Sequence, residues 1–147
     1  MSGAQVSPWG ARRSDEPRCV VQADVSPTAL LDALARALSP CGFRVRTVPG
    51  GLDAVRGVRG GYGLSEVLQL PLMTVLARVE VQVRVLDEAS GGARIGVTCT
   101  AGASEVGAGK RVARALTGAV ARLERAGATV HVGEWSAAWE RAQHDAG

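Results

Sequence analysis

Residues 74–86, Thr-Val-Leu-Ala-Arg-Val-Glu-Val-Gln-Val-Arg-Val-Leu, decide the fold class of this chain of 147 residues. Every second side chain from Val75 to Val85 is apolar, and the residues that alternate with them from Arg78 to Arg84 are charged or carry an amide. Alternation with a period of two is typical of a strand that buries one face and exposes the other. We therefore predict an antiparallel sheet with one buried face and one face in water.

The sequence on both sides of this strand predicts further strands. Residues 88–92, Glu-Ala-Ser-Gly-Gly, indicate a turn, and Ile95, Val97, Cys99 and Ala101 then occupy the inward positions of a partner strand. The same signals predict strands over residues 18–25, 43–48 and 52–58, and a short strand over residues 129–132 is an open alternative that is not counted among them.

Two segments carry the signals of helices. Ser26 and Pro27 are typical of an N-cap and a first helical turn, and Pro40 ends that helix. A longer helix with an apolar stripe is expected from about Ser104 or Gly109 to Ala126. The element order β-α-β-β-(x)-β-β-α predicts an α+β fold, in which two helices cover one face of an antiparallel sheet of about five strands.

We expect a single domain over residues 18–133. A flexible tail is predicted before it, over residues 1–17, and a helical tail after it, over residues 134–147. Aromatic residues outside a core can anchor a partner protein, although a tail tryptophan can also fold back on its own domain. The candidate anchors are Trp9, Trp135 and Trp139.

Composition and charge exclude several classes of protein. Apolar residues make up 46% of the chain but aromatic residues only 3%, and the net charge is +3. This mild basic excess does not resemble a nucleic-acid-binding tail. Three cysteines without a C-x-x-C spacing favour reduced thiols over a disulfide framework or a zinc site. Without a signal peptide or a membrane-spanning stretch, the sequence predicts a cytoplasmic protein with no metal and no cofactor.

Two arginine-bearing surfaces are expected. The first is an arc of the long helix opposite its apolar stripe, formed by Lys110, Arg111, Arg114, Arg122 and Arg125. Such an arc suits an anionic surface of nucleic acid or membrane, or an acidic partner, or it is simply solvated. The second is the wet face of the sheet, with Arg44, Arg46, Arg78, Arg84 and Arg94. Because this face lacks aromatic stacking platforms, sequence-specific RNA binding is disfavoured.

Little in the sequence indicates catalysis. It contains no H-E-x-x-H, G-x-S-x-G or paired-carboxylate motif. A fold can still bring Cys99, His131 and Asp24 together from distant positions. The sequence therefore leaves enzymatic activity open but favours a protein without it.

Three stretches resemble the START and polyketide-cyclase-like helix-grip superfamily. Residues 21–34 look like that family's first strand running into a helix, residues 91–97 like a late strand, and residues 121–125 like the end of its gripping helix. The resemblance implies a curved sheet around a long helix, with an apolar cavity between them. That cavity would be lined by Val79, Val81, Val83, Ile95, Val97, Leu116, Val120 and Leu123. A smaller sheet filled by its own side chains is the alternative.

These observations lead to three functional hypotheses. The first is a non-enzymatic interaction or assembly protein that binds another protein or itself. The second is a carrier of an apolar ligand or lipid in the cavity described above. The third is binding of an anionic surface through the arginine arc. Residues 64–73, which are rich in leucine and follow a glycine loop, fit core, lid or interface.

Overall fold

The computed structural model describes residues 5–57, 78–89 and 91–146. The strand expected over residues 74–86 is β4 (Val79–Ala89), the longest strand among these residues. Its expected first residues, 74–77, and the leucine-rich segment 64–73 lie outside the described residues.

The other elements follow the predicted order closely. The remaining strands are β1 (Arg18–Ala23), β2 (Arg44–Val48), β3 (Gly51–Arg56), β5 (Gly92–Ala101) and β6 (Val130–Val132). The α-helices are α1 (Pro27–Leu38), α4 (Ala108–Arg125) and α5 (Ala138–Ala146), and two short 3-10 helices cover Ala11–Arg13 and Ser39–Cys41.

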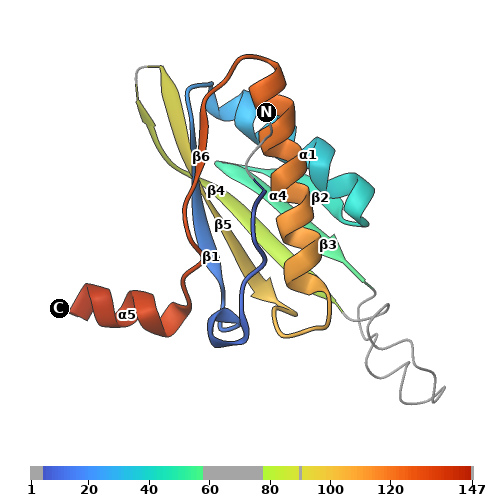
Figure 1. The fold of residues 1–147 in the computed structure, drawn as a ribbon, viewed down its shortest axis with the longest axis vertical. Coiled ribbons are helices and arrows are strands. Elements are labelled where there is room, and N and C mark those ends of the chain that lie inside the picture. The colour runs from blue at the N-terminus through green and yellow to red at the C-terminus, as the bar shows by residue number, and fades with distance from the viewer. Residues whose placement is uncertain (1–4, 58–77, 90, 147) are drawn as a thin grey trace.

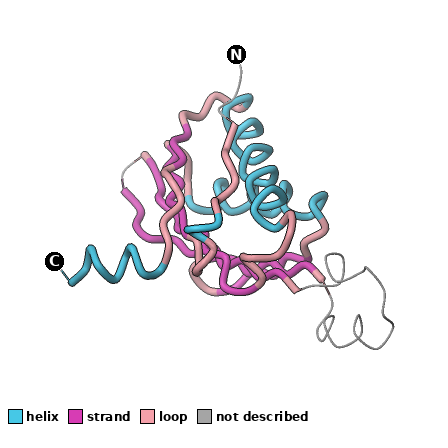
Figure 2. The backbone as a smooth tube through the Cα atoms, turned by 60° about the horizontal axis from the view of Figure 1, so that its bottom comes forward, coloured by secondary structure: helices cyan, strands magenta, loops and turns pink. Residues whose placement is uncertain are grey.

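The six strands form one sheet in the order β2-β3-β4-β5-β1-β6, and every neighbouring pair is antiparallel. The sheet has one strand more than the expected five because residues 130–132 pair with β1. Helices α1 and α4 lie on the same face of the sheet (Figure 1). The view along the sheet shows the strands as one layer and the two helices as a second (Figure 2). The predicted α+β class is confirmed.

Local sequence signals explain where α1 begins and ends. The side chain of Ser26 accepts a hydrogen bond of 3.2 Å from the backbone N–H of Ala29, and Pro27 occupies the first turn, where its missing N–H costs nothing. After the 3-10 turn, Gly42 adopts a φ of +90°, which is accessible to glycine at no steric cost. The chain then turns directly into β2.

The core lies between the helix-covered face of the sheet and the two helices. Alternate residues of β4 and β5, such as Val81, Val83 and Val97, are at most 1% exposed, as are Leu30 and Leu34 of α1. Burial of one such side chain stabilises the fold by about 1.5–3 kcal/mol. The period-two pattern breaks at the β4–β5 register shift between residues 85 and 87, which leaves Val85 only half-buried.

Candidate functional site

The described part of the N-terminal segment packs against the domain, which differs from the flexible tail that we expected over residues 1–17. Trp9 is 9% exposed, and its Nε1 donates a hydrogen bond of 2.8 Å to the carbonyl oxygen of Ala103. The backbone N–H of Val6 donates to Oγ1 of Thr117 on α4 at 2.9 Å. These two attachments hold the segment alongside α4 (Figure 1).

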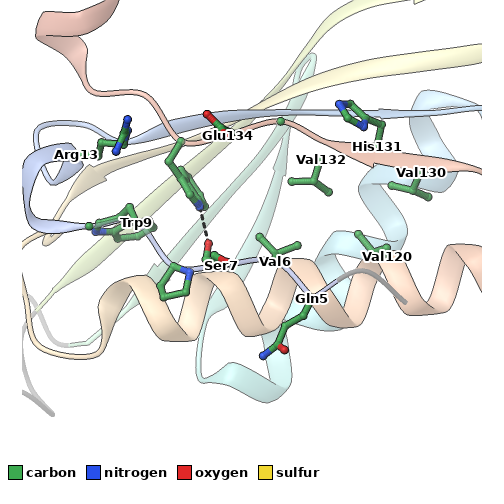
Figure 3. Close-up of a pocket in the computed structure, with 14 residues that line it drawn as sticks. Gln5, Val6, Ser7, Trp9, Arg13, Val120, Val130, His131, Val132 and Glu134 are labelled. Atoms are coloured by element: carbon green, nitrogen blue, oxygen red, sulfur yellow. Dashed lines mark hydrogen bonds between the residues drawn. The ribbon is translucent and has the colours of Figure 1, made fainter. Parts of the chain in front are cut away.

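Trp9 also packs against Trp135, which comes from the other end of the chain. The two ring centroids lie 4.9 Å apart in an edge-to-face arrangement, the favoured geometry for aromatic pairs. Trp135 is 7% exposed, and its Nε1 donates a hydrogen bond of 2.9 Å to the carbonyl oxygen of Ser7 (Figure 3). Both indoles are therefore used inside the protein: Trp9 folds back on its own domain, which was one of its two expected roles, and Trp135 is not displayed to a partner as we expected.

A groove of about 480 Å³ separates the N-terminal segment and α4 from β6 and the residues that follow it. Its apolar wall consists of Val6, Val120, Val130 and Val132; Val120 is buried, and the other three are half-buried. Figure 3 shows that Val130 and Val132 point from β6 toward α4, whereas His131 points the opposite way. The groove is thus an apolar hollow held open between the two ends of the chain.

Polar side chains surround this apolar wall. Gln5, Arg13, His131 and Glu134 line the margins of the groove, and the paired indoles of Trp9 and Trp135 close one end. Gln5, His131 and Glu134 are exposed, and Arg13 is half-buried. An apolar centre with a polar rim is the usual arrangement of a protein-binding surface.

The outer edge of β6 adds unpaired backbone groups to this hollow. On the β1 side, the N–H of Asp24 donates to Thr129 at 3.2 Å, and the N–H of Gly133 donates to Val20 at 2.8 Å. Because bonded residues alternate along an antiparallel ladder, the N–H and C=O groups of Val130 and Val132 point away from β1. Within the described residues, these groups have no hydrogen-bond partner.

Helix α5 leaves the domain beside the groove and projects outward (Figure 1). Its first turn is fixed, because Arg141 donates to the carbonyl oxygens of Ser136 at 2.7 Å and Glu16 at 2.9 Å. None of its residues is buried, and Trp139 is 46% exposed. Trp139 is therefore the expected aromatic anchor that the structure leaves on the surface.

Most arginines of the wet sheet face are compensated by acidic neighbours. The carboxylate of Asp53 forms ion pairs with the guanidinium groups of Arg84, at 2.8 Å, and Arg46, at 3.7 Å. Arg94 pairs with Asp87 at 3.1 Å. In addition, Arg78 pairs with Glu80, and Arg44 donates to the backbone oxygen of Gly57. The arginine-bearing face is thus a mixed-charge surface.

The arginine arc of α4 is divided by the neighbouring helix. Gly118 lies within this arc, and a Cβ added there would be 3.7 Å from the Cβ of Ala37 on α1. Lys110, Arg114, Arg122 and Arg125 are exposed, whereas Arg111 is half-buried. Burial of the Arg56 guanidinium lowers its pKa, and the positive charge of Arg111 lowers this pKa further. Within the described residues none of the five basic side chains of the arc makes an ion pair.

The residues considered for catalysis do not converge. Cys99 points into the core from β5, whereas His131 lies on the edge strand β6 and points to the opposite face of the sheet. Asp24 is engaged elsewhere, since its Oδ1 accepts a hydrogen bond of 2.7 Å from the N–H of Thr129. Among the described residues, no group of three potential ligands could hold a metal ion.

Thiol chemistry is expected to distinguish the three cysteines. Burial raises the pKa of Cys19 to about 12 and that of Cys99 to about 11, whereas Cys41 is half-buried. We expect iodoacetamide to label Cys41 alone in the native protein at neutral pH, and all three thiols in denaturant, as counted by mass spectrometry.

The same pKa shifts predict how stability depends on pH. The thiols of Cys19 and Cys99 ionise in the unfolded chain near their ordinary pKa of 9.0, but only near 12 and 11 in the folded protein. Their contribution to stability is therefore complete below pH 9.0 and is lost as the pH rises toward these folded values. Rapid native labelling of Cys19 or Cys99 at neutral pH would contradict this account.

The apolar pocket expected between sheet and helix is occupied by the protein's own core. Its eight predicted lining residues are 0–7% exposed. Of these eight, only Val120 also lines the groove described above. The open hollow thus lies next to the place where the resemblance to helix-grip proteins implied a cavity.

Comparison with family models, curated proteins and solved structures finds no match to this chain. No helix in the described part of the chain is both long and apolar enough to cross a membrane.

Sequence reasoning singled out Trp9, Trp135, Val120 and His131 for other roles, but it did not predict that they line one groove, and it missed Val6, Val130 and Val132. Val130 and Val132 were visible only as a short alternating strand, and Val6 lay in an expected tail. The Val-His-Val alternation was a usable signal, because it predicts two valines on one face of an edge strand. The opposing wall depends on contacts between the two ends of the chain.

Proposed function

We propose that this protein is a non-enzymatic interaction domain, and that it binds another protein in the groove between residues 5–9 and β6. The observation that carries the proposal is a wall of half-buried valines beside a strand edge whose backbone groups have no partner among the described residues. Open apolar surface and unpaired N–H and C=O groups are both satisfied when a polypeptide covers them.

The surroundings of the groove support this proposal. Helix α5 begins three residues after Trp135, which closes one end of the groove, and it carries the exposed Trp139. A nine-residue helix without a buried residue gains little stability in water by itself. Tryptophan is enriched among the residues that dominate binding energy at protein interfaces. We therefore expect the partner to extend from the groove toward α5.

Site-specific photo-crosslinking in the native host identifies the partner. A benzoylphenylalanine at Glu134, on the exposed rim, should capture a discrete protein, whereas the same group at Gln82, exposed on the opposite face of the sheet, should not. The purified partner should then bind the unmodified protein, and Val132→Arg should weaken this binding about tenfold or more, because a buried contact of about 1.4 kcal/mol is lost.

Gln82→Arg is the matched control, since it adds the same charge on the other face of the sheet. It should leave the affinity unchanged. Thermal unfolding of both variants checks that the fold is intact. If Val132→Arg folds normally and binds the partner as tightly as Gln82→Arg does, the groove is not the binding site.

A further inference from the structure

We infer that the occupant of the groove is an extended peptide segment, which adds to the sheet as another strand alongside β6. This inference rests on the proposed function and specifies its ligand. The groove would recognise this peptide mainly through main-chain hydrogen bonds and through the spacing of the peptide's apolar side chains.

Backbone geometry supplies the first argument. Val130 and Val132 each direct one N–H and one C=O away from β1, and within the described residues these groups are unpaired. An extended chain offers donors and acceptors at every second residue, which is the spacing of these groups along β6. A compact small molecule does not reproduce this repeat.

The walls of the groove supply the second argument. Residues 5–9 and α4 stand opposite β6 across the hollow (Figure 3). A strand that belonged to another folded sheet, including that of a second copy, would bring a neighbouring strand about 4.8 Å further out. That neighbour would meet the N-terminal segment, which is held in place through Val6 and Trp9. The groove therefore favours a single extended chain.

The side chains lining the groove indicate what that chain carries. Along an added strand, every second side chain points to the same face as Val130 and Val132. This face looks toward Val6 and Val120. We therefore expect apolar residues at alternate positions of the ligand and polar residues between them.

The first test uses the unmodified protein and a capped heptapeptide of alternating threonine and valine. Two further peptides carry N-methyl groups, one on the threonine amides and the other on the valine amides. Since alternate amides of a strand face opposite sides, we expect one methylated peptide to bind about tenfold or more weakly, and the other to bind nearly as well as the parent. Isothermal titration calorimetry measures all three.

The second test changes the edge of β6 itself. Val132→Pro removes an N–H that β1 does not use, and Val132→Ala is the control that retains it. The proline variant should bind the parent peptide about tenfold more weakly than the alanine variant does. The exchange rate of the Gly133 amide, which bonds to Val20, reports whether the β1–β6 pairing persists.

Three results would overturn strand addition. The first is an absence of peptide binding at millimolar concentration, and the second is equal affinity of the two methylated peptides. The third is a dimer or a bound small apolar molecule that protects the groove instead. In each case the crosslinked partner is tested again with Val132→Arg. Continued sensitivity to this substitution would leave the proposed function standing with a different mode of binding.

Discussion

Replacing Gly51 by alanine is expected to cost about 3 kcal/mol or more in the free energy of unfolding, because it forces atoms into a packed backbone. A Cβ at Gly51 would lie 1.8 Å from the carbonyl oxygen of Val83. Since the obstructing atom belongs to the backbone of β4, no rotamer change relieves the clash. The strands β3 and β4 must separate locally, which breaks their hydrogen-bonded ladder. Urea unfolding followed by tryptophan fluorescence measures this loss.

The adjacent glycine provides the control. Gly50 has a φ of +76°, but a Cβ there would meet no atom within 4 Å. Gly50→Ala should therefore carry only the cost of left-handed backbone, about 1–2 kcal/mol. Equal losses for Gly50→Ala and Gly51→Ala would show that β3 and β4 do not approach as described.

Trp9→Ala is expected to lower the free energy of unfolding by about 3–5 kcal/mol, the usual range for removal of a buried aromatic ring. The ring packs edge-to-face on Trp135 and against Gly109 of α4, and its Nε1 bonds to Ala103. The substitution leaves a cavity and an unpaired carbonyl oxygen. Far-UV circular dichroism in urea measures the change without depending on tryptophan fluorescence.

Trp139→Ala is the matched control, because the same side chain is 46% exposed on α5. Its effect on stability should remain within about 0.5 kcal/mol. If Trp9→Ala were as mild as Trp139→Ala, residues 5–9 would not be an integral part of the fold. The groove would then lose one of its two walls.

The period-two pattern around β4 predicted the antiparallel sheet, since side-chain alternation reflects local backbone geometry. The cap at Ser26 and the stop at Pro40 likewise placed α1, because capping depends on residues adjacent in sequence. The sequence predicted the core positions Val81 and Val97 for the same reason. What these signals share is that they act over a few residues.

The groove could not be predicted in the same way because its walls are distant in sequence. The indole of Trp135 bonds to the backbone of Ser7, and Asp24 bonds to the backbone of Thr129. Neither contact leaves a periodic pattern. The low aromatic content made each tryptophan conspicuous, yet it did not indicate that Trp9 and Trp135 would find each other rather than a partner.

The arginines of the wet sheet face show a different limit of prediction from the sequence. Their positions on the wet face of the sheet were visible as alternation, but their compensation depends on cross-strand register. Asp53 lies opposite Arg46 on β2, and Gly51 lies opposite Arg84 on β4. This register brings the two guanidinium groups to one carboxylate. Exposed pairs of this kind contribute about 0–1 kcal/mol each, so they shape the surface charge more than the stability.

The most direct test of the binding groove is amide hydrogen exchange, measured by NMR on the free protein and on its complex with the alternating peptide. The account predicts that the amide of Val132 exchanges rapidly in the free protein and becomes protected in the complex. The amide of His131, which faces β1, should be protected in both. An amide of Val132 that remains unprotected when the peptide is bound would contradict the account.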